Sequence, residues 1–114
     1  MYKLVVYVPA THLQGIKQAL FDAGAGRIGD YDQCSWQVLG TGQFRPLAGS
    51  DPFVGKTGEV ESVDEYRLEM VVDDQLVEPV IDALYRAHPY EEPAFDCWQL
   101  FDTAAFRPGP EESS

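Results

Sequence analysis

The chain has 114 residues, of which 45% are hydrophobic, and this length fits one compact domain. Its 19 acidic and 8 basic residues give a formal net charge of −11 at pH 7, which repels nucleic-acid phosphates and anionic lipid headgroups. We therefore predict that the protein binds neither nucleic acid nor membranes. No apolar run is long enough for a membrane span, and the N-terminal residues lack a signal-peptide pattern, so we expect a cytoplasmic location.

An internal repeat predicts the architecture. Residues 2–8 match residues 66–72, and the register continues without a gap at an offset of 64 residues. Apolar residues then recur at helical spacing in both copies, at Leu13, Ile16, Leu20 and Ala23 and at Val77, Val80, Ile81 and Leu84. Each copy reads as strand, helix, strand. Two copies predict an α+β fold of the ferredoxin-like βαββαβ type, with an antiparallel sheet in the order 4-1-3-2 and two helices on one face.

The sequence also suggests where the helices begin and end. Thr11 with Gln14 resembles a capping box for the first helix, and Asp73 or Asp74 is a candidate cap for the second. Gly24 or Gly26 suits the end of the first helix. Pro79 falls just past the expected start of the second helix, so that helix either starts late or has a distorted first turn.

Residues 40–64 are predicted to form a long loop between the second and third strands. This length far exceeds an ordinary hairpin connection, and loops of this size are usually functional or disordered. Glycines and prolines alternate here with aromatic and apolar residues, so we expect the loop to pack against another surface, such as a neighbouring subunit. We assign residues 1–102 to one domain and residues 103–114 to a flexible acidic tail.

The densest group of polar side chains lies at 88–96, where the second helix gives way to the last strand. The predicted topology brings His12 to the same edge of the sheet as His88. Imidazole and carboxylate ligands suit zinc, copper, nickel or iron, so His12, His88 and Glu91 are candidate ligands of a divalent metal ion. Alternatively, His88 caps the carbonyl end of the helix and the acidic residues that follow are solvated. The residues alone leave both interpretations open.

Other candidate residues point to a small ligand rather than to catalysis. Arg27 and Arg45 are candidate contacts for an anionic group, although each arginine would also suit a surface ion pair. Tyr90 and Glu92 are further candidate ligand-binding residues. The segment 50–57 ends in Gly-Lys-Thr but lacks the first glycine and the flanking strand and helix of a phosphate-binding loop. The two cysteines lack metal or redox spacing and are expected to be reduced. We predict no catalytic residue.

Four segments carry a family resemblance, namely 2–9, 24–32, 40–46 and 88–96. Together they resemble the YqfO-type inserted domain of the Nif-three-like family over about residues 2–101. That domain is similar in fold to the signalling protein PII and the cation-tolerance protein CutA, which implies a trimer-forming unit. Full-length members also carry a flanking domain with a two-metal centre. Nothing in this sequence matches that domain, so we expect a stand-alone form to which its metal ligands and its hydrolase or GTP cyclohydrolase labels do not transfer.

These observations favour a small homo-oligomeric module, with a trimer preferred, that binds a divalent metal ion or a small ligand for sensing or delivery. Two alternatives remain open. One is a metal-dependent hydrolase acting on a phosphorylated or cyclic substrate, with water activated by a metal at His12 and His88. The other is a protein-interaction domain that acts through the 40–64 loop.

Overall fold

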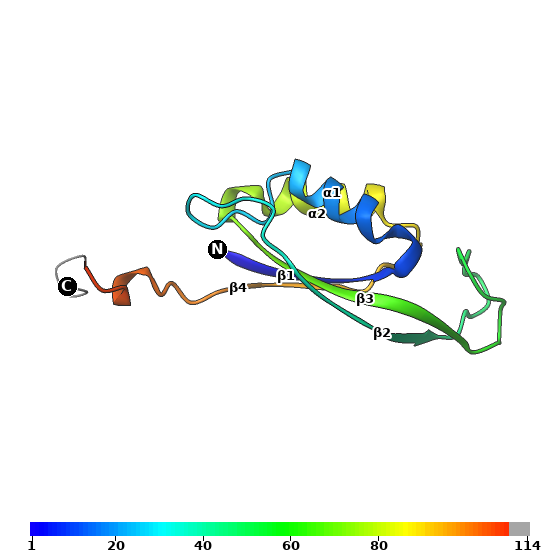
Figure 1. The fold of residues 1–114 in the computed structure, drawn as a ribbon. Helices are drawn as coiled ribbons and strands as arrows, with labels where there is room; N and C mark the ends of the chain where they lie inside the picture. The colour runs from blue at the N-terminus through cyan, green and yellow to red at the C-terminus, as the bar shows by residue number, and fades with distance from the viewer. Residues whose placement is uncertain (110–114) are drawn as a thin grey trace.

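The computed structural model, which describes residues 1–109, contains a four-stranded antiparallel sheet with two helices on one face (Figure 1). Its strands are β1 (Tyr2–Pro9), β2 (Trp36–Phe44), β3 (Glu61–Val72) and β4 (Phe95–Gln99), in the order β2-β3-β1-β4. Each neighbouring pair is antiparallel. This is the predicted order 4-1-3-2 read from the other edge, so the predicted ferredoxin-like α+β fold is confirmed.

The two helices occupy equivalent positions of the repeat. A short 3₁₀ turn, η1 (Ala10–His12), leads into α1 (Leu13–Asp22), and a second, η2 (Asp74–Leu76), leads into α2 (Val77–Ala87). Moving η1 and the start of α1 by 64 residues reproduces the start of η2 and of α2. The duplication read from the sequence is therefore a duplication of structure.

The predicted helix caps are wrong, because the 3₁₀ turns replace them. No side chain caps either helix or either of the turns that precede them. The hydroxyl of Thr11 instead lies 2.8 Å from Nδ1 of His12. Pro79 is the third residue of α2, within the first turn, where backbone N–H groups have no partner inside the helix. The proline is therefore tolerated without a late start. Gly24, with φ of +105°, ends α1 as predicted.

The hydrophobic core lies between the helices and one face of the sheet. Alternate residues of β1 and β3 point into it, and the apolar stripes of both helices cover them. The buried residues are Leu4, Val6, Val8, Leu13, Ile16, Leu20, Ala25, Leu68, Met70, Val72, Val80 and Leu84. Burial of this aliphatic surface is the main force that holds the helices on the sheet.

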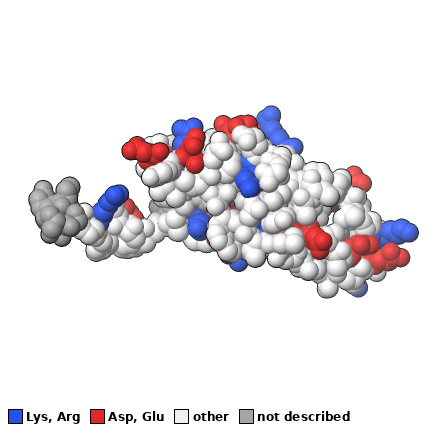
Figure 2. Space-filling view, viewed as in Figure 1, with Lys and Arg blue, Asp and Glu red and all other residues white. Residues whose placement is uncertain are grey.

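The opposite face of the sheet has no helix over it. Strand alternation places Trp36, Val38 and Trp98 there, and their side chains are 58%, 45% and 44% exposed. The charged side chains on this face form an ion-pair cluster in which Glu69 lies 3.7 Å from Lys3 and 3.2 Å from Arg67. This face therefore combines apolar rings with paired charges. On the face of the molecule drawn in Figure 2, basic side chains are scattered and form no continuous patch.

The loop between β2 and β3 is shorter than predicted. Residues 40–44 and 61–64 pair as strand, which leaves 45–60 as the connection. The strand residues that the sequence prediction assigned to the loop include Gly40 and Gly42, because glycine is more common in loops than inside strands. The hairpin extends beyond the end of β1, and the loop turns back at its tip (Figure 1).

In the predicted tail, a 3₁₀ turn, η3 (Ala104–Phe106), is present, and 110–114 lie outside the described residues. Within the described chain, neither helix has the length and apolar character needed to cross a membrane.

Candidate functional site

The end of the sheet at which β1 stops gathers most of the predicted site residues. Aromatic contacts run across this end: the ring of His12 meets Phe53 at 5.4 Å, Phe53 meets Tyr90 at 6.2 Å, and Tyr90 meets His88 at 5.0 Å, all between ring centroids. The two histidines are also close enough for His12 to influence the pKa of His88. The topology thus brings together η1, the β2–β3 loop 45–60, which we call the tip loop, and the α2–β4 connection (88–94), as the sequence predicted.

His88 is a buried structural residue whose ring nitrogens are both used. Its Nδ1 accepts a hydrogen bond from the backbone N–H of Tyr90 at 3.1 Å. Its Nε2 lies 2.8 Å from the backbone oxygen of Tyr7, which can only accept, so Nε2 carries the proton. The side chain is 6% exposed. Burial lowers the pKa of His88, and the hydrogen bond to Tyr7 acts in the opposite direction. The neutral ring therefore ties β1 to the α2–β4 connection.

The side chains predicted to bind a metal already have other partners. Within residues 1–109, no three His, Cys, Asp or Glu side chains are grouped so that they could hold a metal ion. Both nitrogens of His88 bond to backbone groups, and Glu91 Oε1 accepts the backbone N–H of Asp51 at 3.2 Å. Nδ1 of His12 faces the hydroxyl of Thr11. A metal ion held by His12, His88 and Glu91 stays a prediction of the sequence.

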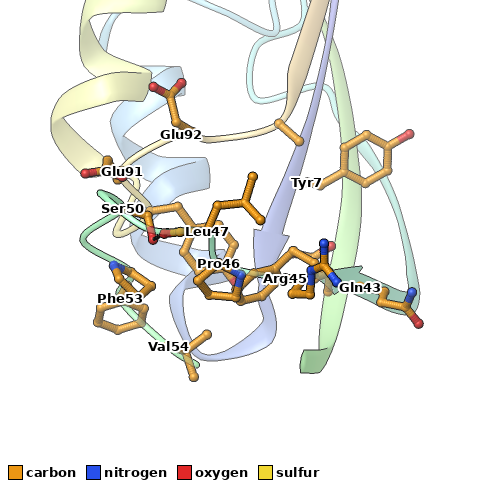
Figure 3. Close-up of a pocket in the computed structure, with 15 residues that line it drawn as sticks. Tyr7, Gln43, Arg45, Pro46, Leu47, Ser50, Phe53, Val54, Glu91 and Glu92 are labelled. Atoms are coloured by element: carbon orange, nitrogen blue, oxygen red, sulfur yellow. Dashed lines mark hydrogen bonds between the residues drawn. The ribbon is translucent and has the colours of Figure 1, made fainter. Parts of the chain in front are cut away.

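A cavity of about 390 Å³ lies between the tip loop and the α2–β4 connection. Figure 3 shows Pro46 and Leu47 near its centre, with Phe53 and Val54 to one side and Gln43 and Arg45 to the other. Its wall is mostly apolar. The lining residues are Tyr7, Gln43, Phe44, Arg45, Pro46, Leu47, Ser50, Pro52, Phe53, Val54, Glu65, Tyr90, Glu91, Glu92 and Ala94.

Tyr90 and Glu65 are the unusual polar groups of this cavity. The phenol oxygen of Tyr90 is buried and makes no hydrogen bond of normal geometry. It nevertheless lies close enough to the Glu65 carboxylate for charge and hydrogen bonding between the two groups to shift both pKa values. Burial raises the pKa of Glu65, which the interaction with Tyr90 partly opposes. Burial also raises the pKa of Tyr90, and the negative charge of Glu65 adds to that increase. Buried polar groups without partners are costly, and they concentrate at functional sites.

Glycines on β2 make room for Glu65. Gly40 pairs with Glu65 across the sheet, and a Cβ atom at Gly42 would collide with the Glu65 carboxylate. Glu65 is not among the residues predicted from the sequence, because a lone acidic residue in a strand resembles any exposed strand position. The sequence feature that could have indicated Glu65 is its pairing with a strand segment that contains two glycines, because glycines leave space above the sheet.

The predicted ligand residues fall into two separate places. Arg45, Tyr90, Glu91 and Glu92 all line the cavity. Arg27 does not, because it follows Gly26, whose backbone N–H bonds to Val71 at the other end of β3. There it lines a separate polar cavity of about 230 Å³ beside Asp22 and Asp32. Arg27 and Arg45 therefore do not contribute to one site.

Several proteins of known sequence match most of this chain, but the matching region is only a part of each of them. No family model matches the chain. A protein of Mycobacterium leprae named GTP cyclohydrolase 1 type 2 homolog is 51% identical over 98 residues, which is 86% of this chain and 26% of the relative. Proteins of the same name from Halalkalibacterium halodurans and Bacillus subtilis are 46% and 45% identical over 88% and 90% of the chain, which spans 27% and 28% of them. The chain thus spans about a quarter of these relatives.

Comparison with solved structures agrees with these sequence matches. A Bacillus cereus protein related to NIF3 aligns with a TM-score of 0.76 at 42% identity, over 89% of this chain and 26% of that protein. The PII-like protein CutA from Nostoc aligns with a TM-score of 0.64 at 21% identity, over 99% of this chain and 89% of CutA, which shows a shared fold. The chain therefore belongs to the Nif-three-like family, in which it corresponds to the YqfO-type domain with a PII- and CutA-like fold.

Proposed function

We propose that this chain is a ligand-binding module that holds a small molecule in the cavity between the tip loop and the α2–β4 connection. The observation that carries this proposal is the buried phenol of Tyr90, whose contact with Glu65 falls short of normal hydrogen-bond geometry, in the wall of a mostly apolar cavity. A ligand that fills the cavity gains apolar burial and gives the phenol a partner. A binding function, for sensing or delivery, requires such a wall but needs no nucleophile and no activated base.

The tip loop supports the proposal because it exposes apolar side chains and is nevertheless held against the rest of the site. Phe53 is 56% exposed and Leu47 is 61% exposed, an apolar surface that a bound molecule would cover. Three contacts hold the loop over the site, namely the hydrogen bond from the Asp51 backbone to Glu91 and the ring contacts of Phe53 with His12 and Tyr90. We expect the loop to close further when the cavity is filled.

A fragment screen followed by nuclear magnetic resonance tests this function. The amide spectrum of the chain should respond to hits at residues 43–54, 65 and 90–94, and Phe53→Ala should weaken those hits. Phe101→Ala is the matched control, because Phe101 is a 77% exposed phenylalanine outside the cavity lining. Hits that perturb only other surfaces, or an equal effect of the two variants, would contradict the proposal.

We also propose that copies of the chain associate through the open face of the sheet, as a trimer. Exposed rings beside an ion-pair cluster are typical of a surface that packs against another protein. Light scattering should give three times the mass of one chain. Val38→Lys should reduce that mass, whereas Val60→Lys, which adds the same charge at a similarly exposed loop position, should leave it unchanged. A single-chain mass for the unaltered protein would refute self-association.

The metal prediction has its own test. Protein purified without a histidine tag would be analysed for bound metal, with His12→Ala and Glu91→Ala as the informative variants. Stoichiometric metal that both variants lose would support a metal site and would make a hydrolase assay with phosphoester and cyclic substrates worthwhile. The name of the curated relatives includes GTP cyclohydrolase, but the chain spans about a quarter of them. We propose that this part of such proteins binds rather than catalyses.

A further inference from the structure

The cavity contains enough chemistry to specify the class of ligand, and this inference rests on the ligand-binding function proposed above. Four aromatic residues line it, namely Tyr7, Phe44, Phe53 and Tyr90. Phe44 and Phe53 lie 6.0 Å and 6.2 Å from Tyr90, centroid to centroid, and both are tilted against it. Apolar residues of the loop complete the wall. A ring or a branched hydrocarbon is the ligand body that such a surface contacts best.

The polar groups of the cavity call for a hydrogen-bond donor. Glu65 offers only acceptor oxygens when ionised, and the Tyr90 phenol offers an acceptor and one donor. A ligand N–H placed between them would serve both groups at once. A ligand carboxylate or phosphate would instead place like charges together near Glu65.

The charge around the cavity favours the same answer. Its lining contains three carboxylates, Glu65, Glu91 and Glu92, and one basic side chain, Arg45. The whole chain has a net charge of −11. This potential attracts cations and repels anions on approach.

We propose that the cavity binds an organic amine, with its hydrocarbon or aromatic part against Phe44, Phe53 and Tyr90 and its nitrogen donating to Glu65 and the Tyr90 phenol. The amine would be protonated at neutral pH, so its hydrogen bond to the carboxylate would be charge-assisted. The ammonium group would also lie near aromatic faces, which attract cations.

Three probes of one size and different charge test this inference: benzylamine, benzyl alcohol and benzoate. Each would be titrated into the full chain at neutral pH and followed by amide chemical shifts. Benzylamine should bind about tenfold more tightly than benzyl alcohol, since one charge-assisted hydrogen bond is worth about that factor. Benzoate should bind most weakly.

Variants identify the atoms responsible. Glu65→Gln removes the charge and Tyr90→Phe removes only the phenol oxygen. Each should bring benzylamine down to the affinity of benzyl alcohol and leave the alcohol unaffected. Asp64→Asn is the matched control, because it removes a carboxylate from the neighbouring, exposed position of β3. The dispersion of the amide spectrum checks that each variant is folded.

The outcomes separate this inference from the function on which it rests. Benzoate or benzyl alcohol binding in the cavity as tightly as benzylamine would overturn the amine class and leave the ligand-binding function standing. So would a benzylamine affinity that Glu65→Gln does not change. If neither the three probes nor a fragment library perturbs the cavity residues, both the amine class and the ligand-binding function fail.

Discussion

The two halves of the chain share a strand, a 3₁₀ turn and a helix, and they diverge at equivalent positions, Gly24 and His88. Gly24 has a left-handed backbone conformation and turns the chain back onto the core, where Ala25 is buried. His88 is extended, and its ring bonds to Tyr7 and Tyr90. The glycine turn needs only backbone hydrogen bonds. The histidine corner needs a side chain, and it projects Tyr90 into a cavity. One scaffold therefore gives a glycine turn at one end and a histidine corner with a candidate site at the other.

Replacing His88 should have the largest effect on stability. His88→Ala leaves the Tyr7 carbonyl and the Tyr90 N–H without their partner, which should lower the free energy of unfolding by about 2–4 kcal/mol. Urea denaturation at a fixed protein concentration measures this loss. His12→Ala is the control and should cost less than about 1 kcal/mol, because His12 is only half-buried. Equal losses would mean that His88 does not tie the corner as described.

The glycine turn should be disrupted by a smaller change at the equivalent position, Gly24. Gly24→Ala forces a side chain into a conformation with φ of +105°, and the new Cβ would lie 2.8 Å from a terminal methyl of Leu76. We expect a loss of about 1–2 kcal/mol. Ligand binding at the other end should be unchanged. Gly29→Ala, where the backbone is also left-handed but the space is open, separates the strain from the contact. Altered binding in Gly24→Ala would show that the two ends are coupled.

The histidine corner should weaken in mild acid. The pKa of His88 is lowered by burial, so the unfolded chain takes up a proton before the folded chain does. Stability from this group is therefore complete above a pH of about 6.5 and falls as the pH drops from there toward the folded pKa. Thermal melting at pH 7.5 and 5.5 should show a drop that His88→Ala reduces. The same drop in both proteins would assign it to other groups.

The smallest expected effect concerns Glu65 in the absence of ligand. Burial raises its pKa, so the carboxylate is disfavoured in the folded protein above that pKa. Glu65→Gln should then stabilise the free protein at pH 7 by no more than about 0.5 kcal/mol, since water screens a group this exposed. The gain should shrink as the pH falls and wild-type Glu65 becomes protonated. Asp64→Asn should show no such gain, and a destabilised Glu65→Gln would mean that the carboxylate supports the fold.

Much of the fold follows from the sequence because it depends on periodic patterns. The 64-residue repeat and the spacing of Leu13, Ile16 and Leu20 specify the strands, the helices and their order, since amphipathic segments have few ways to bury their apolar sides. Local chemistry was less informative. The caps at Thr11 and Asp73 were wrong because the chain uses 3₁₀ turns there, and glycines in β2 suggested a loop because the space they leave for Glu65 is not visible along the chain.

The site shows the same division. From sequence, the topology placed His12, His88 and the loop at one end of the sheet, and composition pointed to Arg45, Tyr90, Glu91 and Glu92, all of which line the cavity. Only the tertiary structure decided that both nitrogens of His88 bond to the backbone, that Arg27 lies at the other end, and that Glu65 faces Tyr90. Hydrogen-bond direction and burial depend on neighbours distant in sequence, and no local pattern encodes them.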